Sequence, residues 1–284
     1  MKQMATLPPL LGRQFFEQEM VQAELLPFAD GTAAVFSTRC PGKESVCEDS
    51  AALIPFIAGS GVLVVADGLG GLPAGDQASS LSIDCLRRAM GEALTQGVEL
   101  RDAILNGFEE ANRVVCEQLP GAATTLAVVE LQRRVIRPFH AGDSTIRVVG
   151  QRGKIKLQTV SHSPVGYAVE AGFLDREEAM HHEERHLISN MIGSPDMHIT
   201  IGAPLTLADR DTLLVASDGL SDNLYQHEIV DRIPKGPIRK VSDRLQRDAL
   251  QRMTSMSNDR PSKPDDLTFI VYRPAVVSCR QATV

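Results

Sequence analysis

Short runs of apolar and β-branched residues recur along most of the chain, and Gly, Pro or Asp bounds each of them. Such runs between turn-forming residues are typical of β-strands. The pattern therefore predicts strands at residues 32–39, 51–57, 61–66, 124–131, 144–150, 153–160, 211–217 and 266–273.

Other segments repeat their apolar residues every three or four positions, which is the spacing of one helix face. They predict two adjacent helices at 76–96 and 100–115, and we expect later helices at 175–192 and 238–257. Many strands have short, turn-like connections, whereas the first helices come as a pair. This order favours antiparallel sheets covered by helices, an α+β layered sandwich, over a repeated strand-helix-strand winding.

The composition narrows the class of protein. The chain has 284 residues, of which 43% are hydrophobic, so it can form one large domain or two small ones. The 36 acidic residues outnumber the 29 basic ones, which argues against nucleic-acid binding. The five cysteines are scattered and form no Cys-x-x-Cys pair, so neither a disulfide framework nor a zinc site is indicated.

The cellular location is expected to be the cytoplasm. No apolar run is long enough to span a membrane, and the start of the chain lacks the features of a signal peptide. The unpaired pattern of cysteines is typical of reduced, intracellular thiols.

An aspartate follows the buried-looking run 61–66 and opens a stretch with few side chains, Asp67-Gly68-Leu69-Gly70-Gly71. Asp67 could cap a tight turn by accepting hydrogen bonds from nearby amides. It could also hold a hard cation, because a carboxylate beside exposed carbonyls suits such an ion. The stretch alone leaves both interpretations open.

Acidic residues lie at strand ends in five separate segments, and each one taken singly is an ordinary turn or cap residue. Together they favour a metal site, because clustered carboxylates repel one another unless a cation lies between them. A binuclear Mg²⁺ or Mn²⁺ centre would supply that charge, since these ions prefer oxygen ligands. The acids are Glu48, Asp49, Asp67, Asp143, Asp218, Asp222, Asp265 and Asp266.

Seven motifs follow one another in order: CED, ADGLGG, GAATTL, AGDST, HSPVGYAVEAGFLDREEAMHH, ASDGLSD and DDLT. In this set and order the chain resembles the metal-dependent protein phosphatases of the protein phosphatase 2C type, as a bacterial-like single-domain member. The resemblance covers about residues 32–273. It implies a four-layer α-β-β-α sandwich with two central antiparallel sheets flanked by helices.

The resemblance also implies roles for the acids. Asp67 would bridge two Mn²⁺ or Mg²⁺ ions, and the carbonyl of Gly68 would reach one of them directly. Asp218 and Asp265 would complete the protein ligands of one metal, so that these residues and Asp67 form the catalytic set.

Four further acids match the family pattern less directly. Glu48 and Asp49 would serve the other metal directly or through water, and Asp143 and Asp222 match acids that hold a weaker third ion in bacterial relatives. The implied reaction is an in-line attack on phosphorus by a metal-bridged water, without a covalent phosphoenzyme. No cysteine lies in a phosphate-cradling glycine-rich loop, and the chain has no G-x-x-x-x-G-K-[ST] motif.

The chain departs from the family pattern at three places. Many relatives have a phosphate-holding arginine before the first acidic pair, where this chain has Glu44, with Lys43 beside it and Arg39 further off. Either cation could bind the substrate phosphate, although a lysine offers a point charge and not a bidentate fork. Leu69 stands where some eukaryotic relatives have a histidine, and Asp266 stands where the family has asparagine.

The expected organisation is an N-terminal extension at 1–31, a catalytic domain at 32–273 and a C-terminal tail at 274–284. A charged segment at about 161–200 resembles the family's substrate-selecting flap, with Tyr167 and Phe173 expected to pack at its base. Its histidines are expected to be surface or packing residues: His162, His181, His182 and His186.

The implied function is hydrolysis of phosphoserine and phosphothreonine in proteins, by a monomer that opposes a serine/threonine kinase and binds neither nucleic acid nor membrane. Two alternatives stay open. A catalytically weak, phosphatase-like binding module would fit the missing arginine, but the intact Asp67, Asp218 and Asp265 argue against it. A small-molecule phosphatase would require a closed, selective pocket.

Overall fold

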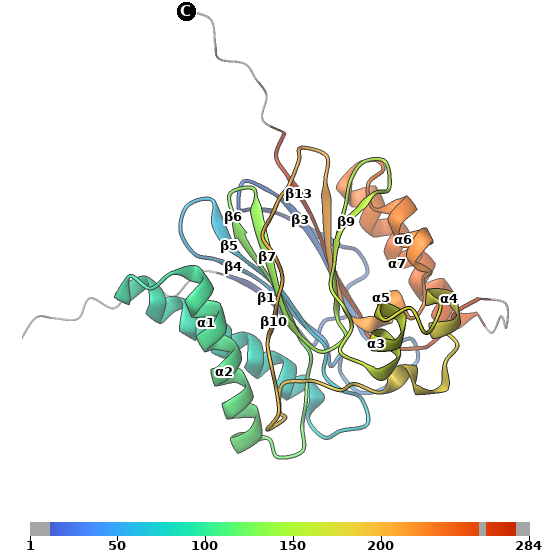
Figure 1. Cartoon of the computed structure of the whole chain (residues 1–284), viewed down its shortest axis with the longest axis horizontal. Coiled ribbons are helices and arrows are strands. Elements are labelled where there is room, and N and C mark those ends of the chain that lie inside the picture. Colours follow the sequence, from blue (N-terminus) through green and yellow to red (C-terminus); the bar gives the residue numbers. More distant parts are fainter. Residues whose placement is uncertain (1–11, 256–259, 277–284) are drawn as a thin grey trace, which may run out of the picture.

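Two antiparallel sheets face each other at the centre of the molecule, and helices cover their outer faces (Figure 1). The computed structural model describes residues 12–255 and 260–276. Within these residues the four-layer α-β-β-α arrangement confirms the predicted fold class. No helix in this part of the chain has the length and apolar character needed to cross a membrane.

The first sheet has the strand order β1-β4-β5-β6-β7-β10, and β11 also pairs with β7. Its strands are β1 (Arg13–Phe16), β4 (Ser50–Pro55), β5 (Ser60–Ala66), β6 (Leu126–Gln132), β7 (Val135–Ala141), β10 (Thr200–Ile201) and β11 (Leu205–Thr206). The second sheet has the order β2-β3-β13-β12-β8-β9. Its strands are β2 (Glu24–Phe28), β3 (Gly31–Thr38), β13 (Leu267–Pro274), β12 (Thr212–Ala216), β8 (Thr145–Val149) and β9 (Ile155–Gln158).

The long helices α1 (Gly75–Gln96) and α2 (Leu100–Gln118) cover the first sheet. The second sheet is covered by α5 (Asp218–Ser221), α6 (Gln226–Arg232) and α7 (Ile238–Thr254). Between β9 and β10 the chain forms α3 (Pro164–Glu170), α4 (Arg176–Ala179) and the 3₁₀ helix η1 (Glu183–His186). Figure 1 shows α3 and α4 close to α5, at one end of the sandwich.

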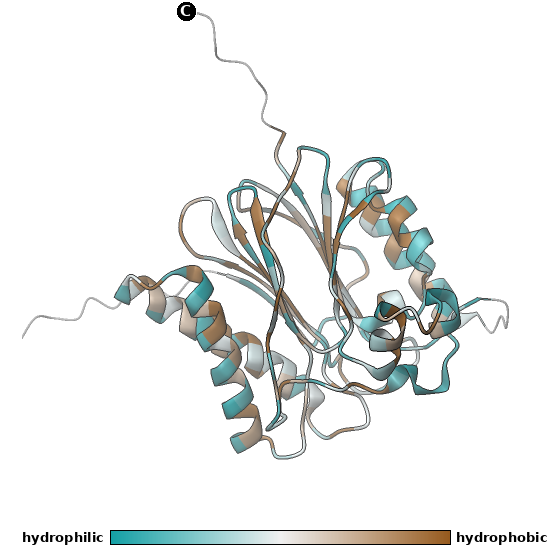
Figure 2. Cartoon of the chain, in the orientation of Figure 1, coloured by the Kyte–Doolittle hydropathy of each residue, from teal (hydrophilic) through white to brown (hydrophobic). Residues whose placement is uncertain are grey.

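Alternation along the strands divides the apolar side chains among three cores. In β5, Leu63 and Val65 pack between the sheets, whereas Val62 and Val64 pack under α1 and α2. Because successive side chains of a strand point to opposite faces, a wholly apolar strand must be covered on both sides. Figure 2 shows the same division, with apolar strands inside and helices that are polar on their outer faces.

Residues 13–28 correct the expectation of an N-terminal extension at 1–31. They contain β1, which pairs with β4, and β2, which pairs with β3, so they form edge strands of the two sheets. The sequence pattern misses them because edge strands are covered less completely: β2 has no fully buried residue. Most of the predicted tail lies outside the described residues, while Pro274 ends β13.

The single helix predicted at 175–192 is wrong. The segment forms only the short α4 and η1, joined by turns. Asp175 caps α4 through a capping box, but the charged stretch that follows has no continuous apolar face to bury, and most of a helix's stability comes from such packing. Phe173 does not pack at the base of the flap, because it is 88% exposed. Of the helix predicted at 238–257, residues 256 and 257 lie outside the described residues.

Candidate metal centre

The strand registers bring the predicted acids to one end of the sandwich. In the second sheet, Ala216 at the end of β12 pairs with Thr145 at the start of β8 and with Phe269 near the start of β13. In the first sheet, Ser50 at the start of β4 pairs with Ala66 at the end of β5. The acids next to these positions therefore meet at a shared edge: Asp49, Asp67, Asp143, Asp218 and Asp265.

Two hydrogen bonds join acids of the first sheet to the residues that follow β12 in the second sheet. The backbone N–H of Asp218 donates to Oδ2 of Asp67 at 3.4 Å. The hydroxyl of Ser217 donates to Oδ2 of the buried Asp49 at 2.8 Å. A side chain at Gly219 would clash with the backbone carbonyl of Asp266, so glycine allows α5 to begin directly against β13.

Burial and, after it, repulsion among these acids raise their pKa values. Burial, followed by the charges of Asp49 and Asp218, raises the pKa of Asp67 well above its usual range. Burial and the neighbouring Asp218 likewise raise the pKa of Asp143 to about 8 and that of Asp265 to about 7. Carboxylates held together in this way need a positive charge between them when they are ionised.

A lysine that the sequence analysis did not single out supplies part of that charge. The Nζ atom of Lys263 lies 2.6 Å from Oδ2 of Asp218, 2.9 Å from Oδ2 of Asp222 and 3.2 Å from Oδ2 of Asp265. Burial lowers the pKa of Lys263, but the three carboxylates outweigh this effect and raise it. The ammonium group therefore lies where three of the predicted metal ligands converge. The sequence contained a signal for this lysine, because Lys263 precedes the predicted metal ligand Asp265 by only two residues.

The donor set fits a hard divalent cation, although its present geometry is closed around Lys263. Within residues 12–255 and 260–276, no group of three or more Asp, Glu, His or Cys side chains is arranged to hold a metal ion. However, the converging donors are carboxylate oxygens, which Mg²⁺ and Mn²⁺ prefer. Oδ1 of Asp143 is also buried without a hydrogen-bond partner among the described residues, which is costly unless a cation or water binds it.

Gly68 and Glu48 lie on the other side of Asp67. The N–H of Gly68 donates to the backbone carbonyl of Glu48 at 3.3 Å, and a side chain at Gly68 would clash with the carbonyl of Gly75. Glycine is therefore required for the backbone to pass between the first acidic pair and the start of α1. This close approach places the turn after β5 beside Glu48.

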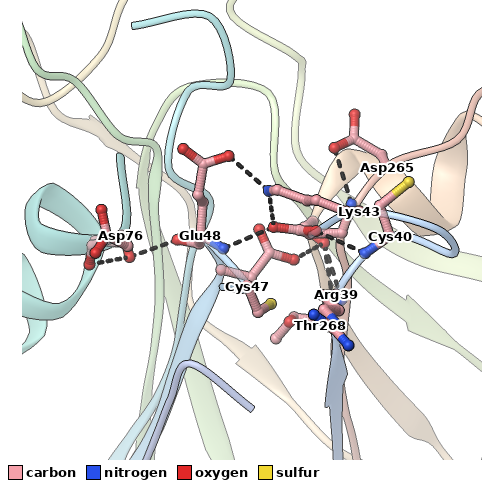
Figure 3. A network of polar contacts seen from close by, with 12 residues as sticks. Arg39, Cys40, Lys43, Cys47, Glu48, Asp76, Asp265 and Thr268 are labelled. Atoms are coloured by element: carbon pink, nitrogen blue, oxygen red, sulfur yellow. Dashed lines mark hydrogen bonds and ion pairs between the residues drawn. The ribbon is translucent and has the colours of Figure 1, made fainter. Parts of the chain in front are cut away.

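Lys43, the cation beside the position of the missing arginine, contacts Asp266, which stands where the family has asparagine. Figure 3 shows Lys43 pointing toward Glu48, and its Nζ lies 2.7 Å from Oε2 of Glu48 and 2.8 Å from Oδ2 of Asp266. Asp266 also accepts hydrogen bonds from the backbone N–H groups of Cys40 and Glu48, at 2.7 Å and 2.6 Å. A carboxylate at 266 thus both neutralises Lys43 and holds the loop before β4, which an asparagine could do only in part.

Arg39 lies further from the acids. Its Nη2 forms an ion pair with Oε1 of Glu19 at 3.0 Å, and its Nη1 donates to the backbone carbonyl of Glu44. Arg39 and Lys43 line the same groove, but only Lys43 contacts predicted metal-centre residues.

The flap histidines divide as expected between packing and surface positions. His162 is buried, stacks on His140 with ring centroids 4.3 Å apart, and makes a hydrogen bond to Thr200. The other three are exposed: His181, His182 and His186.

This sandwich, with acids from both sheets meeting at one edge, has the architecture of a phosphate-ester hydrolase that uses metals. The profile of the protein phosphatase 2C family matches residues 38–256. The chain belongs to this family.

Two relatives with named functions come from streptococci. A protein described as a putative protein phosphatase 2C-type from Streptococcus pyogenes is 31% identical over 180 residues, which are 60% of this chain and 71% of that protein. The protein phosphatase PhpP of Streptococcus pneumoniae is 32% identical over 181 residues, which are 61% of this chain and 73% of PhpP.

Similar solved structures cover a larger share of this chain than the two streptococcal sequences do. The serine/threonine phosphatase of S. agalactiae superposes with a TM-score of 0.71 at 26% identity, covering 85% of this chain and 98% of that one. The catalytic domain of the serine/threonine protein phosphatase PstP, solved in complex with two manganese ions, has a TM-score of 0.65 at 25% identity and covers 86% of this chain and 98% of that one.

Proposed function

We propose that this serine/threonine phosphatase of the protein phosphatase 2C family holds two divalent cations at the acidic edge of its sandwich. The observation that supports this most is the convergence of Asp67, Asp218 and Asp265 from both sheets. Their mutual repulsion requires positive charge, and Lys263 supplies only one unit. The two manganese ions of PstP fit the same requirement.

In this proposal, different acids hold different ions. Asp67 would bridge the two ions, with Asp218 and Asp265 completing one ligand set, and Glu48 and Asp49 serving the other directly or through water. When bound, the ions supply the positive charge that activates water and neutralises the phosphoryl oxygens. Asp143 and Asp222 would hold a weaker third ion, and the Gly68 carbonyl would be a further ligand.

The surroundings orient this centre. Ser217 holds the carboxylate of Asp49, and the N–H of Asp218 holds that of Asp67, so residues after β12 orient two of the proposed ligands. Lys263 would have to move away from Asp218 and Asp265 for a metal to bind both of them. The preferred ion, Mn²⁺ or Mg²⁺, depends on ligand flexibility, since Mg²⁺ demands near-octahedral geometry.

The substrate in this proposal is a phosphoserine or phosphothreonine in a protein, placed there by a serine/threonine kinase. The open cleft beside the acids favours a peptide over a small metabolite, because its lining extends from Asp218 to Gln226 on α6. The test compares phosphate release from a phosphothreonine peptide and from small phosphate monoesters, with Mn²⁺ present. A higher kcat/KM for the peptide supports the proposal, whereas hydrolysis of small metabolites alone would contradict it.

Lys43 is the proposed phosphate-contacting cation. We expect Lys43→Ala to raise KM for a phosphopeptide about tenfold, because a hydrogen bond to a charged group contributes about 1.5–3 kcal/mol. The melting temperature should also fall, since Asp266 would lose the charge that neutralises it. Steady-state kinetics and thermal unfolding of the same preparations measure both effects.

Arg39→Ala is the matched control, because Arg39 lines the same groove but pairs with Glu19. A lower melting temperature with unchanged KM in Lys43→Ala would leave Lys43 a structural role only. A raised KM in Arg39→Ala alone would transfer the phosphate contact to Arg39.

A further inference from the structure

A cleft with a volume of about 780 Å³ runs from the acidic centre along the segment between β9 and β10. Asp143, Asp218 and Asp222 line it on the side of the proposed metals, and residues of α3, α4 and α6 line it elsewhere. Three arginines also line this cleft: Arg147, Arg176 and Arg185.

Arg147 is the unusual member of this lining. It lies on β8, where Ile146 and Val148 pack between the sheets, so Arg147 points to the opposite, helix-covered face together with Val149. Its side chain is only 4% exposed. A charged residue with the apolar neighbours of a central strand is expected to have a carboxylate partner.

No such partner is present among residues 12–255 and 260–276. The Nε and Nη1 atoms of Arg147 are buried without a hydrogen-bond partner in this part of the chain. Arg176 lies near enough to repel it, and burial followed by this repulsion lowers the pKa of Arg147 to about 10. At neutral pH the guanidinium is still charged, and leaving a buried charge without a partner is strongly destabilising.

None of the acids that line the cleft forms an ion pair with Arg147 among the described residues, and Oδ1 of Asp143 stays unpartnered as well. Asp218 and Asp222 are paired with Lys263. Arg176 itself donates to the amide oxygen of Gln226 at 3.1 Å and forms no ion pair within the described residues. Two arginines of one cleft are therefore free to receive an anion, and a guanidinium can bind a carboxylate or phosphate through two parallel hydrogen bonds.

The register of β8 fixes how far this cation lies from the acids. Thr145 pairs with Ala216, two residues before Asp218, and Arg147 lies two residues further along β8. At about 3.3 Å per residue, Arg147 is about 7 Å along the strand from this pair and, because Asp143 and Asp218 lie two residues beyond it, up to about 13 Å from these acids. An extended peptide advances by a similar amount per residue, so this spacing corresponds to about four residues of substrate.

We propose that Arg147 binds a second anionic group of the substrate, a carboxylate or a second phosphate, about four residues from the phosphate that is hydrolysed. This inference rests on the proposed phosphatase function and adds a substrate class to it. Arg176 would strengthen the contact from the flap side of the cleft. The enzyme would accordingly select phosphorylated sites with acidic or doubly phosphorylated surroundings.

The test measures kcat/KM in Mn²⁺ for three phosphothreonine peptides that carry alanine, glutamate or phosphoserine three and four residues away. The wild-type protein should favour the glutamate or phosphoserine peptide over the alanine peptide by about tenfold, the effect expected of one hydrogen-bonded charge pair. A preference for both anions indicates recognition of charge, and a preference for phosphoserine alone indicates recognition of a second phosphate. Arg147→Leu should reduce this ratio to about one.

Arg210→Leu is the control, because it removes the same charge from an exposed residue that bonds to Gln151 near the opposite end of β12. This variant should keep the wild-type ratio. If Arg147→Leu does not fold, as judged by circular dichroism, Arg147→Lys decides the question: a lower ratio supports the bidentate contact, and an unchanged ratio overturns it.

Failure of this inference and failure of the proposed function give different results. A wild-type protein that hydrolyses all three peptides equally well in Mn²⁺ retains the phosphatase function but overturns the role of Arg147. Retention of the preference in Arg147→Leu also overturns it. A wild-type protein without metal-dependent hydrolysis of any peptide would contradict the proposed function itself.

Discussion

Removing divalent metal with a chelator, followed by dialysis, should abolish hydrolysis of a phosphothreonine peptide, and adding Mn²⁺ or Mg²⁺ should restore it. Among the described residues, Lys263 and Lys43 are the cations that form ion pairs with these carboxylates, and the acids neutralise both, so a phosphoryl group there needs the positive charge of a metal. The expected loss is at least about a hundredfold, the scale of removing a main electrostatic contribution to the transition state. Phosphate release before chelation, after it and after metal addition measures the effect.

Thiol alkylation is the control for a cysteine-based mechanism. Burial raises the pKa of Cys40, Cys47 and Cys85, so these thiols are not activated as nucleophiles. Full activity after exhaustive chelation, combined with sensitivity to alkylation, would replace the metal mechanism with a thiolate one.

Asp67→Asn and Asp218→Asn should each lower kcat by at least about a hundredfold under saturating Mn²⁺, because each removes a charged ligand at the reacting centre. Folding should survive, since asparagine has nearly the same shape as aspartate. In Asp67→Asn the metal-free protein should melt at or above the wild-type temperature. Burial, followed by the charges of Asp49 and Asp218, raises the pKa of Asp67, so its ionised form destabilises the fold near neutral pH. The uncharged amide of asparagine removes that cost.

Rates of phosphopeptide hydrolysis and melting temperatures with and without Mn²⁺ provide the measurement. Asp196→Asn, in an exposed turn of the flap, is the matched control and should change neither quantity. Near wild-type turnover in folded Asp67→Asn or Asp218→Asn would contradict the assignment of the centre.

The sequence predicts the elements that carry a strong periodic pattern. The apolar run 61–66 becomes β5, and the helical spacing from Leu100 onwards becomes α2, because burial on one or both faces imposes that pattern. The edge strands β1 and β2 carry a weaker pattern. In the flap, the charged sequence was compatible with a helix, but short turns with little buried surface formed instead.

The acids of the candidate site were predictable as a set because all of them except Asp222 lie within two residues of a strand end. Their partners were not predictable, because they lie far away in the sequence. Lys263 contacts Asp218 and Asp222 across about forty residues, and Lys43 contacts Asp266 across more than two hundred. Arg147 reads in the sequence as an ordinary polar position of a strand. Only the packing of β8 between its neighbours shows that its charge is buried and has no partner in the part of the chain that the structure describes.

The most direct test of the metal centre is anomalous X-ray diffraction from crystals of the protein grown with Mn²⁺. We predict two strong anomalous peaks bridged by the carboxylate of Asp67, one of them also in contact with Asp218 and Asp265, and the ammonium of Lys263 displaced from between these acids. The absence of manganese from this edge of the sandwich, with Lys263 still bound to Asp218, Asp222 and Asp265 at saturating Mn²⁺, would contradict the account.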